Sequence, residues 1–73
     1  MSKITYKPLL KTLENKNMLL NDIKLGLKMS SRTTSKFNKD EMVNLDTIIR
    51  VCEFLDVPIE DVVQIAKFYD GGD

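Results

Sequence analysis

Apolar residues recur at helical spacing in five segments of the chain, and polar residues fill the positions between them. This spacing predicts helices near residues 8–16, 20–27, 31–38, 45–55 and 59–69. The clearest pattern is the fourth, LDTIIRVCEFL, in which five residues recur at helical intervals: Leu45, Ile48, Ile49, Cys52 and Leu55. We therefore expect an all-α fold, built as a compact bundle of five helices.

The ends of the predicted helices carry residues that start or stop helices. Pro8 suits a first turn, because the N–H that proline lacks has no acceptor there. Asn17 can adopt a left-handed conformation after the first helix, Asn44 can cap the fourth, and Pro58 separates the fourth from the fifth. Residues 2–6, SKITY, alternate polar and apolar side chains, which fits either a short edge strand or an extended arm.

Residues 18–37 contain two short amphipathic helices joined by a three-residue turn, Lys28-Met29-Ser30. Ser30 can cap the second helix by accepting a hydrogen bond from a free backbone N–H one turn on. Thr34 and Phe37 share one side of that helix, which we assign to the core. Two short helices with such a turn are typical of a helix-turn-helix.

The exact position of this turn depends on Gly26. Glycine inside a helix costs about 1 kcal/mol relative to alanine, so either close packing requires it or the helix ends there. We place the turn after residue 27, because Leu27 and Met29 are then both buried and Ser30 remains the cap.

Charge divides the chain into a basic and an acidic half, although the net charge of its 73 residues is zero. Residues 1–39 hold nine Lys or Arg and two acidic residues, whereas residues 40–73 hold two basic and nine acidic residues. Five cations lie between the acidic residues 22 and 40: Lys24, Lys28, Arg32, Lys36 and Lys39. This basic cluster coincides with the helix-turn-helix, so we expect it to attract a polyanion such as double-stranded DNA rather than only to solvate a helix.

Composition argues against several other classes of protein. The chain has no histidine, no glycine-rich phosphate loop and no nucleophile elbow, so we expect no enzyme, no cofactor, no metal site and no small-molecule ligand. Cys52 is the single cysteine, which excludes an internal disulfide and fits a small core residue. With no membrane-spanning run and no signal peptide, we expect a soluble, cytoplasmic protein of one domain, residues 1–73, with an arm at 1–6 and a frayed tail at 70–73.

The order of these features resembles the Cro-repressor-like (XRE family) helix-turn-helix transcriptional regulators. The resemblance covers about residues 6–65 and rests on several short motifs: Tyr6, Leu9, Leu10 and Leu13; Lys16-Asn17-Met18; Asn21-Asp22-Ile23; Ser30-Ser31-Arg32-Thr33; residues 39–45, KDEMVNL; and residues 51–55, VCEFL. It implies a five-helix fold of the lambda-repressor-like DNA-binding type, with the third helix in the major groove of duplex DNA. In this family the turn between the second and third helices usually holds a left-handed glycine, a position that Lys28 occupies here.

The resemblance also implies which residues contact DNA. Three residues are similar to those that face bases: Ser31, Arg32 and Lys36. Five are similar to those that lie near phosphates: Leu20, Asn21, Thr33, Lys39 and Asn44, the first two through the backbone. The chemistry of Arg32 agrees, because a guanidinium can donate two hydrogen bonds to guanine O6 and N7.

A single short recognition helix contacts too few base pairs to select one site in a genome, so we expect a homodimer spanning two half-sites. Two surfaces offer spare apolar side chains for pairing, the SKITY arm and the predicted fifth helix with Val63, Ile65, Phe68 and Tyr69. The favoured function is therefore a DNA-binding transcriptional regulator that acts as a repressor. The alternative is a protein-interaction module, such as an antitoxin-like or phage accessory factor, which Leu19, Leu20 and the acidic second half would favour.

Overall fold

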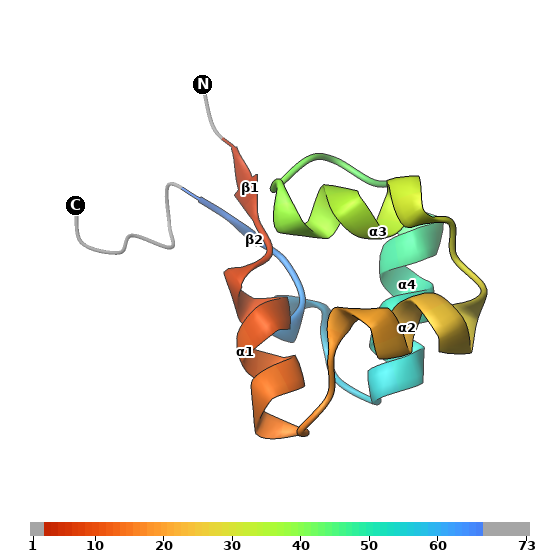
Figure 1. The fold of residues 1–73 in the computed structure, drawn as a ribbon. Helices are drawn as coiled ribbons and strands as arrows, with labels where there is room; N and C mark the ends of the chain where they lie inside the picture. Colours follow the sequence, from red (N-terminus) through yellow and green to blue (C-terminus); the bar gives the residue numbers. More distant parts are fainter. Residues whose placement is uncertain (1–2, 67–73) are drawn as a thin grey trace.

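The computed structural model describes residues 3–66, which form four α-helices, one turn of 3-10 helix and a two-stranded antiparallel sheet (Figure 1). In chain order the elements are β1 (Ile4–Thr5), α1 (Lys7–Asn15), α2 (Leu20–Leu27), α3 (Ser31–Asn38), α4 (Leu45–Leu55), η1 (Ile59–Asp61) and β2 (Gln64–Ile65). The predicted helical class is confirmed, and so are the bounds of α2, α3 and α4. Within residues 3–66 no helix is long and apolar enough to span a membrane.

The prediction of a fifth helix is wrong for the described residues. After Pro58 the chain makes only one 3-10 turn and then becomes extended, so that β2 pairs with β1 in the register Ile4↔Ile65 and Thr5↔Gln64. Val62 is fully buried while its neighbour Val63 is half-buried, and such β-branched residues favour an extended chain. Phe68, Tyr69 and the predicted tail at 70–73 lie outside the described residues.

The N-terminal segment is a strand that leads directly into the core. Of the two alternatives left by its alternating pattern, the paired edge strand is found, while Tyr6 next to it has no exposed surface. The Tyr6 backbone N–H donates to a carboxylate oxygen of Asp40 at 2.9 Å, and its hydroxyl donates to the carbonyl of Glu41 at 2.7 Å. These bonds fasten β1 to the connection between α3 and α4, residues 39–44.

The core lies where the four helices and Val62 meet. It consists of Tyr6, Leu9, Leu13, Ile23, Phe37, Ile48, Val51, Leu55 and Val62. The rings of Tyr6 and Phe37 meet edge to face, with centroids 4.8 Å apart and planes at 77°, which is a favourable aromatic geometry. This contact ties the inner side of α3 to the first residues of the domain.

Several residues of the predicted apolar stripes lie outside this core. Leu10 is 44% exposed, Leu45 69% and Ile49 51%, whereas Cys52 is half-buried. Helical spacing places Leu45 and Ile49 on one side of α4, but α4 buries the adjacent side, with Ile48 and Val51.

All four helices are followed by a non-glycine residue in the left-handed conformation. Asn17 (φ 57°) and Asp40 (φ 56°) come one residue after the C-caps of α1 and α3, and Lys28 (φ 56°) and Asp56 (φ 59°) are the C-caps of α2 and α4. Asn and Asp tolerate this conformation better than other side chains, and Asn17 was predicted to adopt it. Lys28 has no such advantage.

Candidate nucleic-acid interface

The turn between α2 and α3 is built by backbone hydrogen bonds and one side-chain cap. Lys28 is left-handed, with φ 56° and ψ 43°, and the N–H of Met29 then donates to the carbonyl of Lys24 at 2.9 Å. The hydroxyl of Ser30 accepts from the N–H of Thr33 at 3.1 Å, as predicted. The left-handed residue therefore lies at the position that the resemblance implies, here with a lysine instead of glycine.

The side chains that flank the turn hold it against the core. Leu27 and Met29 are half-buried and pack against the core residues. On α3, Phe37 is 1% exposed and Thr34 9%, and the hydroxyl of Thr34 donates to the carbonyl of Ser30 at 3.0 Å. The inner side of α3 is thus fixed as predicted, which leaves its other side facing outward.

Helix α4 supports the same turn through two contacts, one with the end of α2 and one with Gly26. The guanidinium of Arg50 donates to the carbonyl of Leu27 at 2.6 Å, at the end of α2. A Cβ added to Gly26 would lie 2.5 and 2.6 Å from two atoms of the Phe54 ring, so close packing is the reason for this glycine. Gly26 was a signal for the second contact, but nothing in the sequence marks Arg50, which is 23 positions from Leu27.

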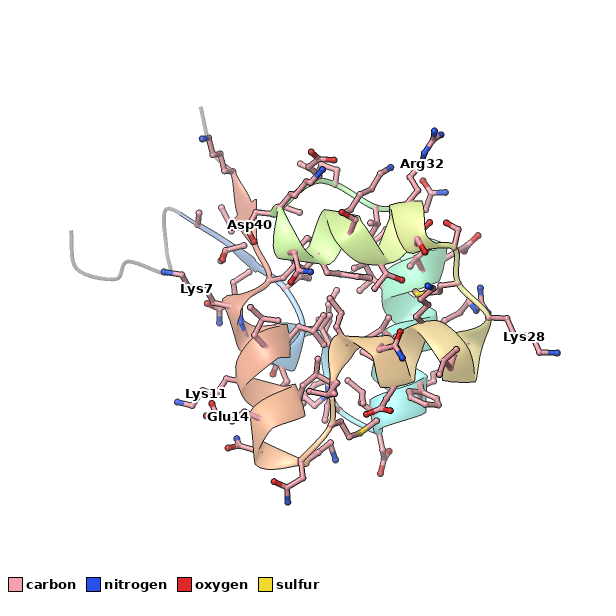
Figure 2. The ribbon with its side chains drawn as sticks, viewed as in Figure 1. Lys7, Lys11, Glu14, Lys28, Arg32 and Asp40 are labelled. Carbon is pink, nitrogen blue, oxygen red and sulfur yellow. The ribbon has the colours of Figure 1, made fainter. Side chains whose placement is uncertain are left out.

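The three predicted base-contacting residues lie on the part of α3 that does not enter the core. Ser31 and Arg32 are exposed in the first turn, and Lys36 is half-buried one turn further along. Because residues four apart share a side of a helix, Arg32 and Lys36 are neighbours on this surface. Figure 2 shows the Arg32 side chain extending away from the body of the protein.

The five predicted phosphate-contacting residues are more scattered. Asn21, Lys39 and Asn44 are exposed, in α2, after α3 and before α4 respectively, while Thr33 and Leu20 are half-buried. Leu20 packs against the core, so it can offer a phosphate only its backbone N–H, which has no acceptor within the helix at this first-turn position. Leu20 and Asn21 lie at the end of α2 opposite the turn, and Asn44 holds the N-cap position of α4 without a side-chain hydrogen bond to that helix.

The charge near the turn is positive. Lys28 and Arg32 both extend away from the protein in Figure 2, and Lys24 and Lys36 lie one turn before and after them. At the start of α2, the carboxylate of Asp22 accepts a hydrogen bond from the N–H of Leu19 at 2.8 Å. The helix-turn-helix therefore presents hydroxyls, amides and cations, the groups that proteins use to contact nucleic-acid bases and phosphates.

Residues 3–66 contain no group of three His, Cys, Asp or Glu side chains that could hold a metal ion. Burial raises the pKa of the Cys52 thiol, which keeps it protonated and unreactive near neutral pH.

Comparison with known proteins gives two matches. The model of the Cro/C1-type helix-turn-helix DNA-binding domain matches residues 8–67. The crystal structure of transcriptional regulator VanUg is similar to this chain with a TM-score of 0.86 and 25% sequence identity, over 89% of this chain and 87% of that one. No curated protein matches the sequence. These matches confirm the resemblance found in the sequence.

Proposed function

The chain belongs to the Cro/C1-type helix-turn-helix DNA-binding family, and from this premise we propose that it is a transcriptional repressor that binds specific sites in duplex DNA as a homodimer. In this proposal α3 lies in the major groove, and the protein acts in the cytoplasm without catalytic activity. The similarity to a transcriptional regulator supports the regulatory role.

The observation that carries this proposal is the division of α3 into two sides. Thr34 and Phe37 anchor it to the core, while Ser31 and Arg32 are exposed at its start. The bonds at Ser30 and Leu27 hold that start in place before DNA arrives, so little ordering is needed on binding. We assign base contacts to Ser31, Arg32 and Lys36.

We assign the phosphate contacts to the surrounding backbone and side chains: Leu20, Asn21, Thr33, Lys39 and Asn44. Lys39 is the charged residue of this group, so its contact with a phosphate would be electrostatic. Cations on the phosphates raise the affinity for every DNA sequence, and each releases about one counterion when it binds.

The test begins with selection of bound sequences from a random pool of duplexes. A two-fold symmetric motif would support both sequence reading and the dimer. Binding of the variants Arg32→Ala and Lys39→Ala to the selected site and to mismatched sites is then compared.

We expect Arg32→Ala to lose about 1–3 kcal/mol of discrimination at one base position. Lys39→Ala should weaken binding to all sites equally and reduce the slope of log K against log salt by about 1. Lys11→Ala is the matched control, since it removes an exposed cation from α1, on another part of the surface (Figure 2). If Arg32→Ala and Lys39→Ala change base preference alike, the assigned roles are wrong.

A protein-interaction module remains the second candidate because two leucines are exposed, one at the N-cap of α2 and one within it. Leu19 is 71% exposed and Leu25 66%, although both belong to the helix-turn-helix. Binding to duplex DNA that stays constant from about 50 to 200 mM salt would contradict a phosphate-driven mode and favour this candidate.

A further inference from the structure

A groove lies between β1 and the connection from α3 to α4. Its volume is about 620 Å³, and residues 3–5 form one wall and residues 39–42 the other. Next to the groove, the two hydrogen bonds of Tyr6 to Asp40 and Glu41 join the chain after β1 to residues 39–42, so the fold fixes the position of its walls.

The groove is marked by an exposed methionine. Met42 is 68% exposed although it neighbours the half-buried Val43, which packs against the core. Methionine is flexible and adapts to irregular surfaces, which makes it a common contact residue where proteins meet. When two identical surfaces meet across a two-fold axis, the apolar side chain of each copy can enter the groove of the other.

Charge selects a second copy of the chain as the partner. A two-fold interface brings the same patch of both copies together, so the patch must attract itself. The groove carries both signs of charge, with Lys3 on one wall and Lys39, Asp40 and Glu41 on the other. The start of α3 carries the exposed cations Lys28 and Arg32, and two copies would repel each other there.

From these observations we infer that the groove between β1 and residues 39–42 is the homodimer surface, with Met42 of each copy seated in the groove of the other. This inference rests on the proposed function, because the dimer that it describes is the one that binds two half-sites. The sequence offered two pairing surfaces, the N-terminal segment and a fifth helix. The proposed dimer uses the first of these, as strand β1, and not the second.

The test measures self-association and DNA binding separately. Sedimentation equilibrium of the full chain at concentrations from about 10 μM to 1 mM covers the weak association expected of an interface below about 1,200 Å². We expect Met42→Glu to weaken self-association about tenfold or more, because it places a carboxylate beside Asp40 and Glu41 of both copies. Leu25→Glu is the matched control, because it adds the same charge at an equally exposed apolar position on α2.

The outcomes distinguish this inference from the proposed function. Met42→Glu that stays folded, binds a half-site duplex normally and loses cooperative binding to the symmetric site would support the inference. A wild-type chain that is monomeric at 1 mM and on DNA, or equal effects of the two variants, would overturn it. A dimer that depends on Met42 but binds neither duplex would support the inference and refute the proposed function.

Discussion

The close approach of Gly26 to Phe54 allows a prediction about stability. Replacing Gly26 by alanine should destabilise the protein when the Phe54 ring is present and stabilise it when the ring is absent. Replacing glycine by alanine inside a helix normally stabilises a protein by up to about 1 kcal/mol. In this protein the new Cβ would lie 2.5 Å from Cζ and 2.6 Å from Cε1 of the Phe54 ring, closer than packed atoms approach, so the ring must move. Phe54 is 40% exposed, and it can swing toward solvent without disturbing the backbone.

The cost of this movement exceeds the gain in helix propensity. A fully buried phenylalanine contributes about 1.5–3 kcal/mol, so displacing a partly covered ring forfeits about 1–1.5 kcal/mol. An off-rotamer side chain adds about 0.5–1.5 kcal/mol. We therefore expect Gly26→Ala to lower the free energy of unfolding by about 0.5–2 kcal/mol in the wild-type chain.

A double-mutant cycle measures this coupling. In a Phe54→Ala background the ring is absent, so Gly26→Ala should raise the free energy of unfolding by up to about 1 kcal/mol. Urea unfolding followed by circular dichroism of the four proteins gives the values, and a change of 1 kcal/mol corresponds to about 4–8 °C in Tm for a domain of this size. If Gly26→Ala stabilises both backgrounds equally, the ring is not the reason for the glycine.

Three further predictions concern other parts of the domain. Lys28→Gly should raise Tm by about 4–8 °C, since it removes about 1 kcal/mol of left-handed strain from the turn, and an unchanged Tm would show that the lysine is not strained. Burial raises the pKa of the Tyr6 hydroxyl above its usual value of 10.0, so the stability contributed by the neutral phenol is complete below pH 10 and is lost as the pH rises through the folded-state pKa. Tyr6→Phe should cost about 1 kcal/mol at neutral pH, through the unpaired Glu41 carbonyl, and should abolish that alkaline dependence in chemical unfolding measured from pH 8 to 11. Arg50→Met should lower stability by up to about 1 kcal/mol, because the carbonyl at the end of α2 loses its donor, and Arg50→Lys should restore part of this loss in the same urea assay.

The sequence predicted the helix-turn-helix well because the residues that start its helices and mark their buried sides act over short distances in the sequence. Ser30 is placed to cap α3, and Thr34 and Phe37 mark its inner side within one helical turn. These residues interact with neighbours a few positions away, so spacing alone carries the information. The outward side of α3 then follows without any knowledge of the tertiary structure.

The remaining features could not be predicted because their partners are distant in the sequence. The spacing of Val62 and Ile65 suits a helix, but Ile65 pairs with Ile4 near the other end of the chain. The same distance hides the contact of Arg50 with Leu27. Helical spacing also cannot distinguish an apolar side that enters the core from one that remains exposed.

The assignment of the candidate site is uneven for a related reason. Arg32 and Lys36 lie on one side of a single helix, so their common placement needs only helical geometry. Asn21, Lys39 and Asn44 come from three separate elements, and their roles depend on how a duplex lies across all three. These phosphate contacts remain predictions until DNA binding is measured.

The pairing of β1 with β2 joins the two ends of the described chain into a ring. Directly opposed residues in antiparallel strands lie about 5 Å apart, so a short linker could connect residue 65 to residue 4. New ends could then be opened at the exposed Asn17, between α1 and α2, without cutting any helix. Such a circular permutant would keep every core contact, which makes the sequential order of the helices a property of this chain rather than a requirement of its packing.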